Sequence, residues 1–349
     1  MVIPAWCFES RRTERQRTSS SRQAIAALAI ACMCLALAAR APAMAESPAN
    51  PGDAAHESQL RVRGGELYLR ETGRGRSIII LHGGPDFDHR YLLPDLDRLS
   101  DSYHLIYYDQ RGRGQSAVGV HAQEVSLASD IADLDSIREH FHLQSVVLLG
   151  HSWGTVLALE YALRHPQRVS DLVLMNPAPA SAADLALFRA AYAQKLGPDF
   201  EQQRQIIASA PYRAGDPQAV TRRYRLHFKP ALMRSGDYER LMARMQAAFM
   251  SQGAEGILTA RAVEDNLMRE TWQRADYDLL PRIAGLGIRT LVISGDHDFF
   301  PAAIAEHIAR ATATGELVVL KDCGHFAFLE CPSGVHTHID AFLRSRQER

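Results

Sequence analysis

One short segment, Gly150-His151-Ser152-Trp153-Gly154, places a serine between two glycines at the spacing G-x-S-x-G. The apolar run before it, residues 145–150, is rich in β-branched side chains and predicts a buried parallel strand. The run after it, residues 155–165, has apolar side chains at helical spacing and ends before Pro166. A strand, a tight turn and a helix in this order are the setting of a nucleophile elbow.

Two interpretations of Ser152 follow from this setting. Serine is a favoured helix N-cap, and glycines are common in strand-to-helix turns. In a nucleophile elbow the same turn strains the serine backbone and exposes its hydroxyl at the positive end of the following helix. The choice depends on whether a base and an acid occur elsewhere in the chain.

Strand and helix patterns alternate along the chain and predict a mostly parallel sheet covered on both faces. An edge hairpin is expected first, and residues 180–277 show helical patterns without a strong strand. Outside that region, strand patterns lie within residues 77–85, 103–116, 169–179, 288–301 and 316–332, and the segment 103–116 runs on into a glycine-rich loop. A helix capped by Ser126 is expected at 126–141, and a final helix at 334–346.

The expected fold is therefore α/β, with a mostly parallel central sheet and an inserted α-helical cap. About 300 residues can bury a core of this size. We expect the first part of the core at 46–179, the cap at 180–279 and the second part of the core at 280–349.

Residues 1–45 have the layout of a secretory signal peptide, with five arginines up to Arg22, an apolar run at 24–39 and an A-x-A site ending at Ala45. Cleavage there predicts a periplasmic or secreted protein. A retained membrane anchor or a mistaken start codon is the alternative. The remaining chain would carry 33 basic and 38 acidic residues, and it has no basic patch or second apolar span. We therefore expect no nucleic-acid partner and no stable membrane span after cleavage.

Only Cys323 and Cys331 lie beyond the expected cleavage site. An exported chain could join them as a disulfide, but two buried free thiols are the favoured interpretation. The sequence says nothing of the oligomeric state.

A serine needs a base to act as a nucleophile, and the base needs an acid that orients it. Asp296 and Asp298 come directly after the strand expected within residues 288–301, and His325 follows the last strand. Open α/β sheets place their sites at the carboxyl ends of strands, so these side chains should meet Ser152. Asp298 is the expected acid because Asp296 directly follows Gly295 and is better placed to form the turn.

The reaction also needs donors for the oxyanion. We expect the backbone N–H of Trp153 and a second N–H from His82-Gly83-Gly84-Pro85, where glycines allow close approach. Gly84 is the first choice for the second donor, and Gly83 is the alternative.

These motifs together resemble the α/β-hydrolase superfamily and, within it, the proline iminopeptidase-like group of serine hydrolases. The resemblance covers residues 60–344 in order, and the cap resembles the group least. The elements that carry it are HGGP at 82–85, DQRGRGQS at 109–116, GHSWG at 150–154, GDHD at 295–298 and CGH at 323–325.

The resemblance implies an aminopeptidase whose cap carboxylates hold the free α-amino group of the substrate. Glu264, Asp265 and Glu270 are the candidates, although acidic residues on a helix are more often a solvated face. The group often continues HGGPG, whereas Asp86 stands there in this chain. Asp109 and Arg111 are expected to be structural and to pair within their loop.

The predicted function is an exported serine hydrolase that cleaves an amide or ester bond of a small molecule or short peptide through an acyl-enzyme. A carboxylesterase or lactonase is the alternative, and a binding protein on the same scaffold or a cofactor-free lyase or oxygenase are further ones. No P-loop or dinucleotide fingerprint occurs, so no cofactor is implied. No metal site is expected, because His336 and His338 are two residues apart on a predicted helix and do not share a face.

Overall fold

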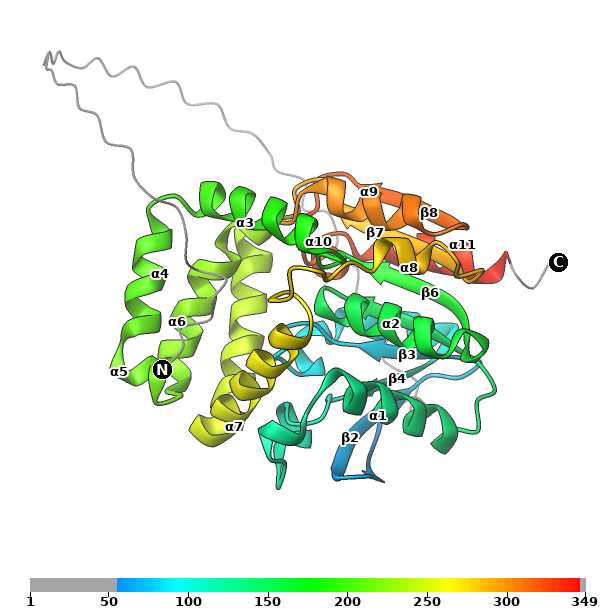
Figure 1. Cartoon of the computed structure of the whole chain (residues 1–349), viewed down its shortest axis with the longest axis horizontal. Helices are drawn as coiled ribbons and strands as arrows, with labels where there is room; N and C mark the ends of the chain where they lie inside the picture. Colours follow the sequence, from blue (N-terminus) through cyan, green and yellow to red (C-terminus); the bar gives the residue numbers. More distant parts are fainter. Residues whose placement is uncertain (1–54, 346–349) are drawn as a thin grey trace, which may run out of the picture. The chain divides into compact units, whose positions relative to one another are not determined.

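Eight strands form one sheet in the order β1-β2-β4-β3-β5-β6-β7-β8 (Figure 1). The computed structural model describes residues 55–345, so the expected signal peptide lies outside the described residues. The strands are β1 (His56–Val62), β2 (Gly65–Thr72), β3 (Arg76–Leu81), β4 (Tyr103–Tyr108), β5 (Val146–His151), β6 (Val169–Met175), β7 (Arg289–Gly295) and β8 (Gly315–Leu320).

The sheet is antiparallel at one edge and parallel elsewhere. β1 and β2 form the expected edge hairpin, and β2 pairs antiparallel with β4. All remaining pairs from β4 to β8 are parallel. The central strands are buried on both faces, as Ile78, Ile79 and Ile80 of β3 illustrate, because helices cover both sides. This confirms the predicted α/β class.

Two layers of helices cover the sheet (Figure 1). One layer is a row of four helices that contact one another in sequence: α1 (Leu127–His140), α2 (Trp153–Arg164), α8 (Leu280–Ile283) and α9 (Ala302–Ala311). The other contains α10 (Ala327–Glu330), α11 (Pro332–Arg344) and the 3₁₀ helix Asp95–Asp101. Ser126 caps α1 by accepting a hydrogen bond from the Ser129 N–H, as expected. No helix among residues 55–345 has the length and apolar character needed to cross a membrane.

A helical insertion separates β6 from β7 and comprises residues 182–270. Its helices are α3 (Ala182–Leu196), α4 (Asp199–Ala208), α5 (Ala210–Arg213), α6 (Pro217–Phe228) and α7 (Ser235–Glu270). α7 contacts the 3₁₀ helices His89–Leu92 and Gly114–Ala117, which follow β3 and β4. The insertion therefore lies over the carboxyl ends of the strands, where the sequence places its candidate site residues.

α7 is not a single straight helix. Gly253 interrupts it with φ +65° and ψ −176°, a conformation that L side chains rarely adopt. The break separates the half of α7 that contacts the loop after β3 from the half that carries Glu264.

Candidate active site

Ser152 occupies the turn between β5 and α2 in a strained conformation. Its φ is +55° and its ψ is −120°, an outlier for a residue with a side chain. The turn is fixed by the Ser152 N–H, which donates to the Met175 carbonyl of the neighbouring strand at 3.1 Å. Ser152 stands directly before α2 and is partly exposed, so its hydroxyl lies at the positive end of that helix.

The two glycines of the motif are required by close backbone contacts. A Cβ atom on Gly150 would lie 2.5 Å from the Gly154 carbonyl oxygen. A Cβ atom on Gly154 would collide with the carbonyl of Leu81 at the end of β3. The G-x-S-x-G spacing therefore reflects the packing of α2 against β3 as well as the turn itself.

His325 is bonded to Asp298, and both side chains are buried. The Nδ1 atom of His325 lies 2.9 Å from Oδ1 and 3.2 Å from Oδ2 of Asp298. Asn176, just after β6, donates its side-chain N–H to Asp298 Oδ2 at 2.8 Å. The Phe300 N–H donates to Oδ1 at 2.9 Å. Asp298 is thus held from three sides, and it presents an oriented carboxylate to the histidine.

Asp296, the other candidate acid, lies elsewhere. Its Oδ1 accepts from the Cys323 N–H at 3.3 Å and lies 2.7 Å from His297 Nδ1. It therefore fixes the turns after β7 and β8, while Asp298 meets the candidate base.

The loop that carries His325 is anchored to the helical insertion. The His325 N–H donates to the Ala231 carbonyl at 2.7 Å, and the Gly324 N–H donates to Glu330 Oε2 at 2.7 Å. Cys323 and Cys331 form a disulfide, so the favoured expectation of two free thiols is wrong, and a covalent bond closes this loop. His325 is consequently fixed by hydrogen bonds on one side and a cross-link on the other.

The loop after β3 comes very close to Ser152. The Gly83 N–H donates to the Tyr91 hydroxyl at 2.7 Å, so it is already used within the protein. Gly84 has φ +124°, and a Cβ atom on it would collide with the Asp86 N. Trp153 is the first residue of α2, so its N–H has no partner within the helix. These contacts favour Gly84 over Gly83 as the second oxyanion donor beside Trp153.

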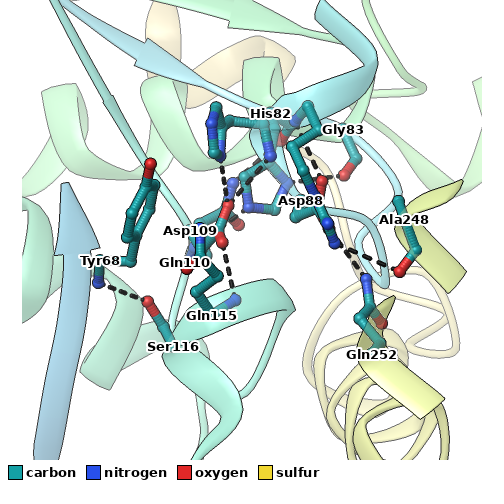
Figure 2. A network of polar contacts seen from close by, with 12 residues as sticks. Tyr68, His82, Gly83, Asp88, Asp109, Gln110, Gln115, Ser116, Ala248 and Gln252 are labelled. Carbon is teal, nitrogen blue, oxygen red and sulfur yellow. Dashed lines mark hydrogen bonds and ion pairs between the residues drawn. The ribbon is translucent and has the colours of Figure 1, made fainter. Parts of the chain in front are cut away.

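A buried polar network fixes the same loop (Figure 2). Burial lowers the pKa of His82 to about 4, so its ring is neutral. His82 Nδ1 donates to the Gly83 carbonyl at 2.9 Å, and Nε2 accepts the Gln110 N–H at 3.0 Å. Asp109 accepts from the His89 N–H and from the Gln115 N–H, which links the loops after β3 and β4.

Three buried groups in this network bring metal-ligand atoms within 4.8 Å of one another: Asp88, His89 and Asp109. The hydrogen bonds that these residues make within the protein explain why they lie so close together. Asp109 Oδ1 lies 2.7 Å from His89 Nδ1, and Asp88 Oδ2 accepts from the Arg90 guanidinium at 2.6 Å. We therefore interpret this group as structural.

Asp88 also connects the loop to α7. Its Oδ2 accepts from the Gln252 side-chain N–H at 2.9 Å, and Arg90 donates to the Ala248 carbonyl at 3.2 Å (Figure 2). Gln252 directly precedes the break in α7 at Gly253. These contacts hold the end of the first half of α7 against the loop that approaches Ser152.

Residues 76–332 match the family model for the α/β-hydrolase fold. The chain belongs to the α/β-hydrolase family. It is 27% identical over 282 residues to the proline iminopeptidase of Lactobacillus crispatus, an alignment that covers 78% of this chain and 93% of the relative. The chain is therefore a hydrolase of the proline iminopeptidase-like group.

Solved structures share the fold of this hydrolase. A proline iminopeptidase-related protein from Thermus thermophilus superposes with a TM-score of 0.63 at 21% identity, covering 83% of this chain and 97% of the other. An enol-lactonase from Burkholderia xenovorans superposes with a TM-score of 0.61 at 20% identity, covering 82% and 100%. At these identities the superpositions show the fold alone.

The three candidate carboxylates of this hydrolase have different surroundings. Glu270 Oε2 accepts the Leu127 N–H at 2.9 Å, so it caps the first turn of α1. Asp265 and Glu264 are both partly exposed residues, and burial raises the pKa of Asp265. Burial and the negative charge of Asp86 raise the pKa of Glu264 to about 8.

Glu264 and Asp86 belong to one charged cluster between α7, α6 and the loop after β3. Asp86 is buried and accepts a hydrogen bond from the Tyr224 hydroxyl. The buried Arg223 guanidinium lies 4.1 Å from the centre of the Tyr224 ring, and its charge acts on both carboxylates. Of the three predicted carboxylates, only Glu264 has a described partner on the loop beside Ser152.

Sequence patterns do not point to three residues of this site. Asp86 stands out only as a departure from HGGPG, and Asn176 and Tyr91 belong to no motif. Asn176 follows the carboxyl end of β6, a position that could have drawn notice. The prediction that Arg111 pairs within its own loop is wrong, since Arg111 pairs with Asp133 of α1 with Nε to Oδ2 at 2.8 Å.

Proposed function

We propose that this hydrolase acts through an acyl-enzyme formed on Ser152, with His325 as the base and Asp298 as the orienting acid. The main support is the hydrogen bond between His325 Nδ1 and Asp298 Oδ1 at 2.9 Å. The backbone carbonyl of His325 is also hydrogen-bonded to the side chain of His151, the residue before Ser152. An imidazole held at Nδ1 by a carboxylate keeps its other nitrogen for proton transfer.

The reaction proceeds in two steps. Ser152 Oγ attacks the carbonyl carbon of the substrate while His325 takes the hydroxyl proton. The N–H groups of Trp153 and Gly84 stabilise the oxyanion, and His325 then protonates the leaving amine or alcohol. Water attacks the acyl-enzyme with His325 again as base, and the acid product leaves Ser152 free.

The substrate class that we propose is an amide of an N-terminal amino acid with a free α-amino group, as for a proline iminopeptidase-type aminopeptidase. The similarity to curated proline iminopeptidases supports it. So does the pair of Glu264 and Asp86 beside the loop after β3, because a substrate ammonium would favour the ionised form of Glu264.

A carboxylesterase or lactonase is the second candidate, and one observation favours it. The buried Arg223 acts on both Glu264 and Asp86. If the two carboxylates serve only to compensate this charge, the site needs no ammonium in its substrate, and neutral esters would be the better substrates.

The experiment compares a proline arylamide with a short-chain p-nitrophenyl ester, using wild type, Ser152→Ala and Glu264→Gln. We expect Ser152→Ala to lose both activities. We expect Glu264→Gln to raise KM for the arylamide at least tenfold and to leave the ester KM within twofold. Ester turnover without arylamide turnover would support the second candidate, and turnover of both by Ser152→Ala would contradict the mechanism.

We also propose that the protein is exported after cleavage behind Ala45. The composition of residues 1–45 supports export, and a disulfide between Cys323 and Cys331 is typical of a protein that reaches an oxidising compartment. Amino-terminal sequencing of the protein from cell fractions tests it. A mature chain that begins at Glu46 in the periplasm or medium is the expected result, and an intact amino terminus in the cytoplasm would overturn it.

A further inference from the structure

Three loops of the site meet at two buried side chains, Tyr91 and His151. The Tyr91 hydroxyl accepts the Gly83 N–H at 2.7 Å and lies 2.7 Å from His151 Nδ1. His151 Nε2 lies 3.0 Å from the carbonyl oxygen of His325. The oxyanion loop, the residue before Ser152 and the loop of the candidate base are thus joined in one chain of hydrogen bonds.

The direction of each bond follows from the chemistry of its ends. A carbonyl oxygen only accepts, so His151 Nε2 carries the proton and donates to His325. The Nδ1 atom of the neutral ring then has only a lone pair, so the Tyr91 hydroxyl donates to it. That leaves the Tyr91 oxygen to accept from Gly83. Burial and the neighbouring His325 lower the pKa of His151 well below its usual range, which keeps the ring neutral.

The aromatic packing around Tyr91 and His151 does not depend on the Tyr91 hydroxyl. The ring of Tyr91 lies 6.1 Å from those of Phe326 and Phe328, and the ring of His151 lies 5.2 Å from that of Phe328. A phenylalanine at position 91 would keep these aromatic contacts and remove both hydrogen bonds of the hydroxyl. The structure therefore offers a substitution that separates the hydrogen-bond chain from the core that surrounds it.

We propose that Tyr91 and His151 are positioning residues that hold the Gly84 N–H, Ser152 and His325 at the spacing that the transition state requires. The inference rests on the proposed function, because it assigns these residues to the same reaction. Neither side chain touches the reacting atoms in this account. Tyr91 acts by holding Gly83, which fixes the peptide that leads to Gly84, and His151 acts by holding the backbone of His325.

If Tyr91 has this role, its removal should weaken stabilisation of the transition state and leave substrate binding nearly unchanged. Small displacements of catalytic groups can lower rates by about 100-fold, whereas ground-state binding is less sensitive. We expect Tyr91→Phe to lower kcat by about 10- to 100-fold with KM within about twofold. The affinity for an alkyl boronic acid, which forms a tetrahedral adduct with a nucleophilic serine, should fall by the same factor.

A matched control is available at Tyr277. Its hydroxyl is buried and has no hydrogen-bond partner among residues 55–345, and it lies in the segment after α7. Tyr277→Phe removes the same atom from the interior and should leave kcat, KM and boronate affinity within twofold of wild type. The kcat of each variant is calculated from the concentration of titratable serine, so that unfolded protein does not lower the value.

The outcomes distinguish this inference from the proposed function. A wild type that is not titrated by a fluorophosphonate, or Ser152→Ala that retains turnover, would overturn the proposed function and this inference with it. A wild type that behaves as expected, with Tyr91→Phe unchanged in kcat and boronate affinity per titrated serine, would overturn this inference alone. A Tyr91→Phe variant in which only KM changes would also overturn it. His151→Phe should show the same loss as Tyr91→Phe, and the double variant should lose little more than either.

Discussion

Gly83 faces Ser152 so closely that a Cβ atom on Gly83 would lie 2.9 Å from the Cβ of Ser152. The same atom would lie 2.9 Å from the Tyr91 hydroxyl and 3.0 Å from the His151 carbonyl oxygen. An alanine at position 83 must therefore displace the oxyanion loop or the turn of Ser152. We expect Gly83→Ala to lower kcat/KM by about 100-fold, measured with the substrate that wild type hydrolyses best.

Gly287→Ala is the control for this prediction. A Cβ atom on Gly287 meets no heavy atom within 4 Å, so the substitution should leave kcat/KM unchanged. Equal rates for Gly83→Ala and wild type would contradict the close approach of the two loops.

Asn176 connects two parts of the site through a single amide. Its side-chain N–H group donates to Asp298 Oδ2 at 2.8 Å and to the Gly324 carbonyl at 3.1 Å. Asn176→Asp keeps the shape of the side chain but replaces the donor to Asp298 with a second carboxylate. The variant loses the donor that holds Asp298, so kcat/KM should fall by about 10-fold or more. An unchanged kcat/KM in a variant with full serine titration would contradict this arrangement.

Glu264 makes stability depend on pH. Burial and Asp86 raise its pKa in the folded protein to about 8, against 4.5 for an unperturbed glutamate. Between these values the folded state binds more protons than the unfolded chain, so this residue lowers stability as pH rises. We expect Glu264→Gln to gain thermal stability over wild type, with a gain that grows from pH 5 to pH 8.

The control for Glu264 lies on the same helix. Glu255 is exposed on α7, and Glu255→Gln should show a difference from wild type that does not grow with pH. Scanning calorimetry at pH 5, 7 and 9 makes the comparison. A Glu264→Gln variant that is less stable than wild type at pH 9 would contradict the raised pKa of Glu264.

Asp88 holds the oxyanion loop to α7 and also caps the 3₁₀ helix His89–Leu92. It accepts the Arg90 N–H at 3.0 Å and binds the side chains of Arg90 and Gln252. Loss of a cap costs about 1 kcal/mol, and leaving a partly buried donor unpaired costs about 1–3 kcal/mol. We expect Asp88→Ala to lower the free energy of unfolding by about 2 kcal/mol or more in urea, and Asp88→Asn, which keeps the cap acceptor, by less. A loss within about 0.5 kcal/mol for Asp88→Ala would speak against this anchor.

The disulfide between Cys323 and Cys331 closes a short loop around His325. Loop-closure entropy for a segment of this length predicts a stabilisation of about 2–3 kcal/mol. We expect a phosphine reductant to lower the urea midpoint of wild type and to leave the Cys323→Ala/Cys331→Ala variant unchanged. Activity should fall less than tenfold on reduction, because Ala231 and Glu330 still hold the loop. A midpoint that does not respond to reduction would show that the two thiols are unpaired.

The residues that sequence patterns locate are those at the ends of regular elements. Ser152, Asp298 and His325 each follow an apolar strand, and the order of the strands brings such positions to one edge of the sheet. Local patterns therefore predicted the fold and the meeting of Asp298 with His325. The preference for Gly84 over Gly83 gained its reason only from the structure, where Tyr91 already binds the Gly83 N–H.

Other relationships have no local signature. Tyr91 and His151 are 60 residues apart, and no periodicity or motif connects a tyrosine in one loop to a histidine at the end of a strand. The prediction for Arg111 failed for a related reason, since its partner Asp133 lies on a helix that the loop pattern does not include. Residues 180–277 were predicted as helical, but the sequence pattern does not show that Glu264 interacts with Asp86, because the two residues are far apart in the chain.

Labelling of the protein with a fluorophosphonate, followed by peptide mass spectrometry, shows whether Ser152 is the nucleophile. We expect one adduct, on Ser152, in wild type, with complete loss of hydrolysis. Ser152→Ala should carry no adduct, and His325→Ala should react at least 100-fold more slowly because its serine has no base. An adduct on another residue, or hydrolysis that survives complete labelling of Ser152, would contradict the role of Ser152 as nucleophile.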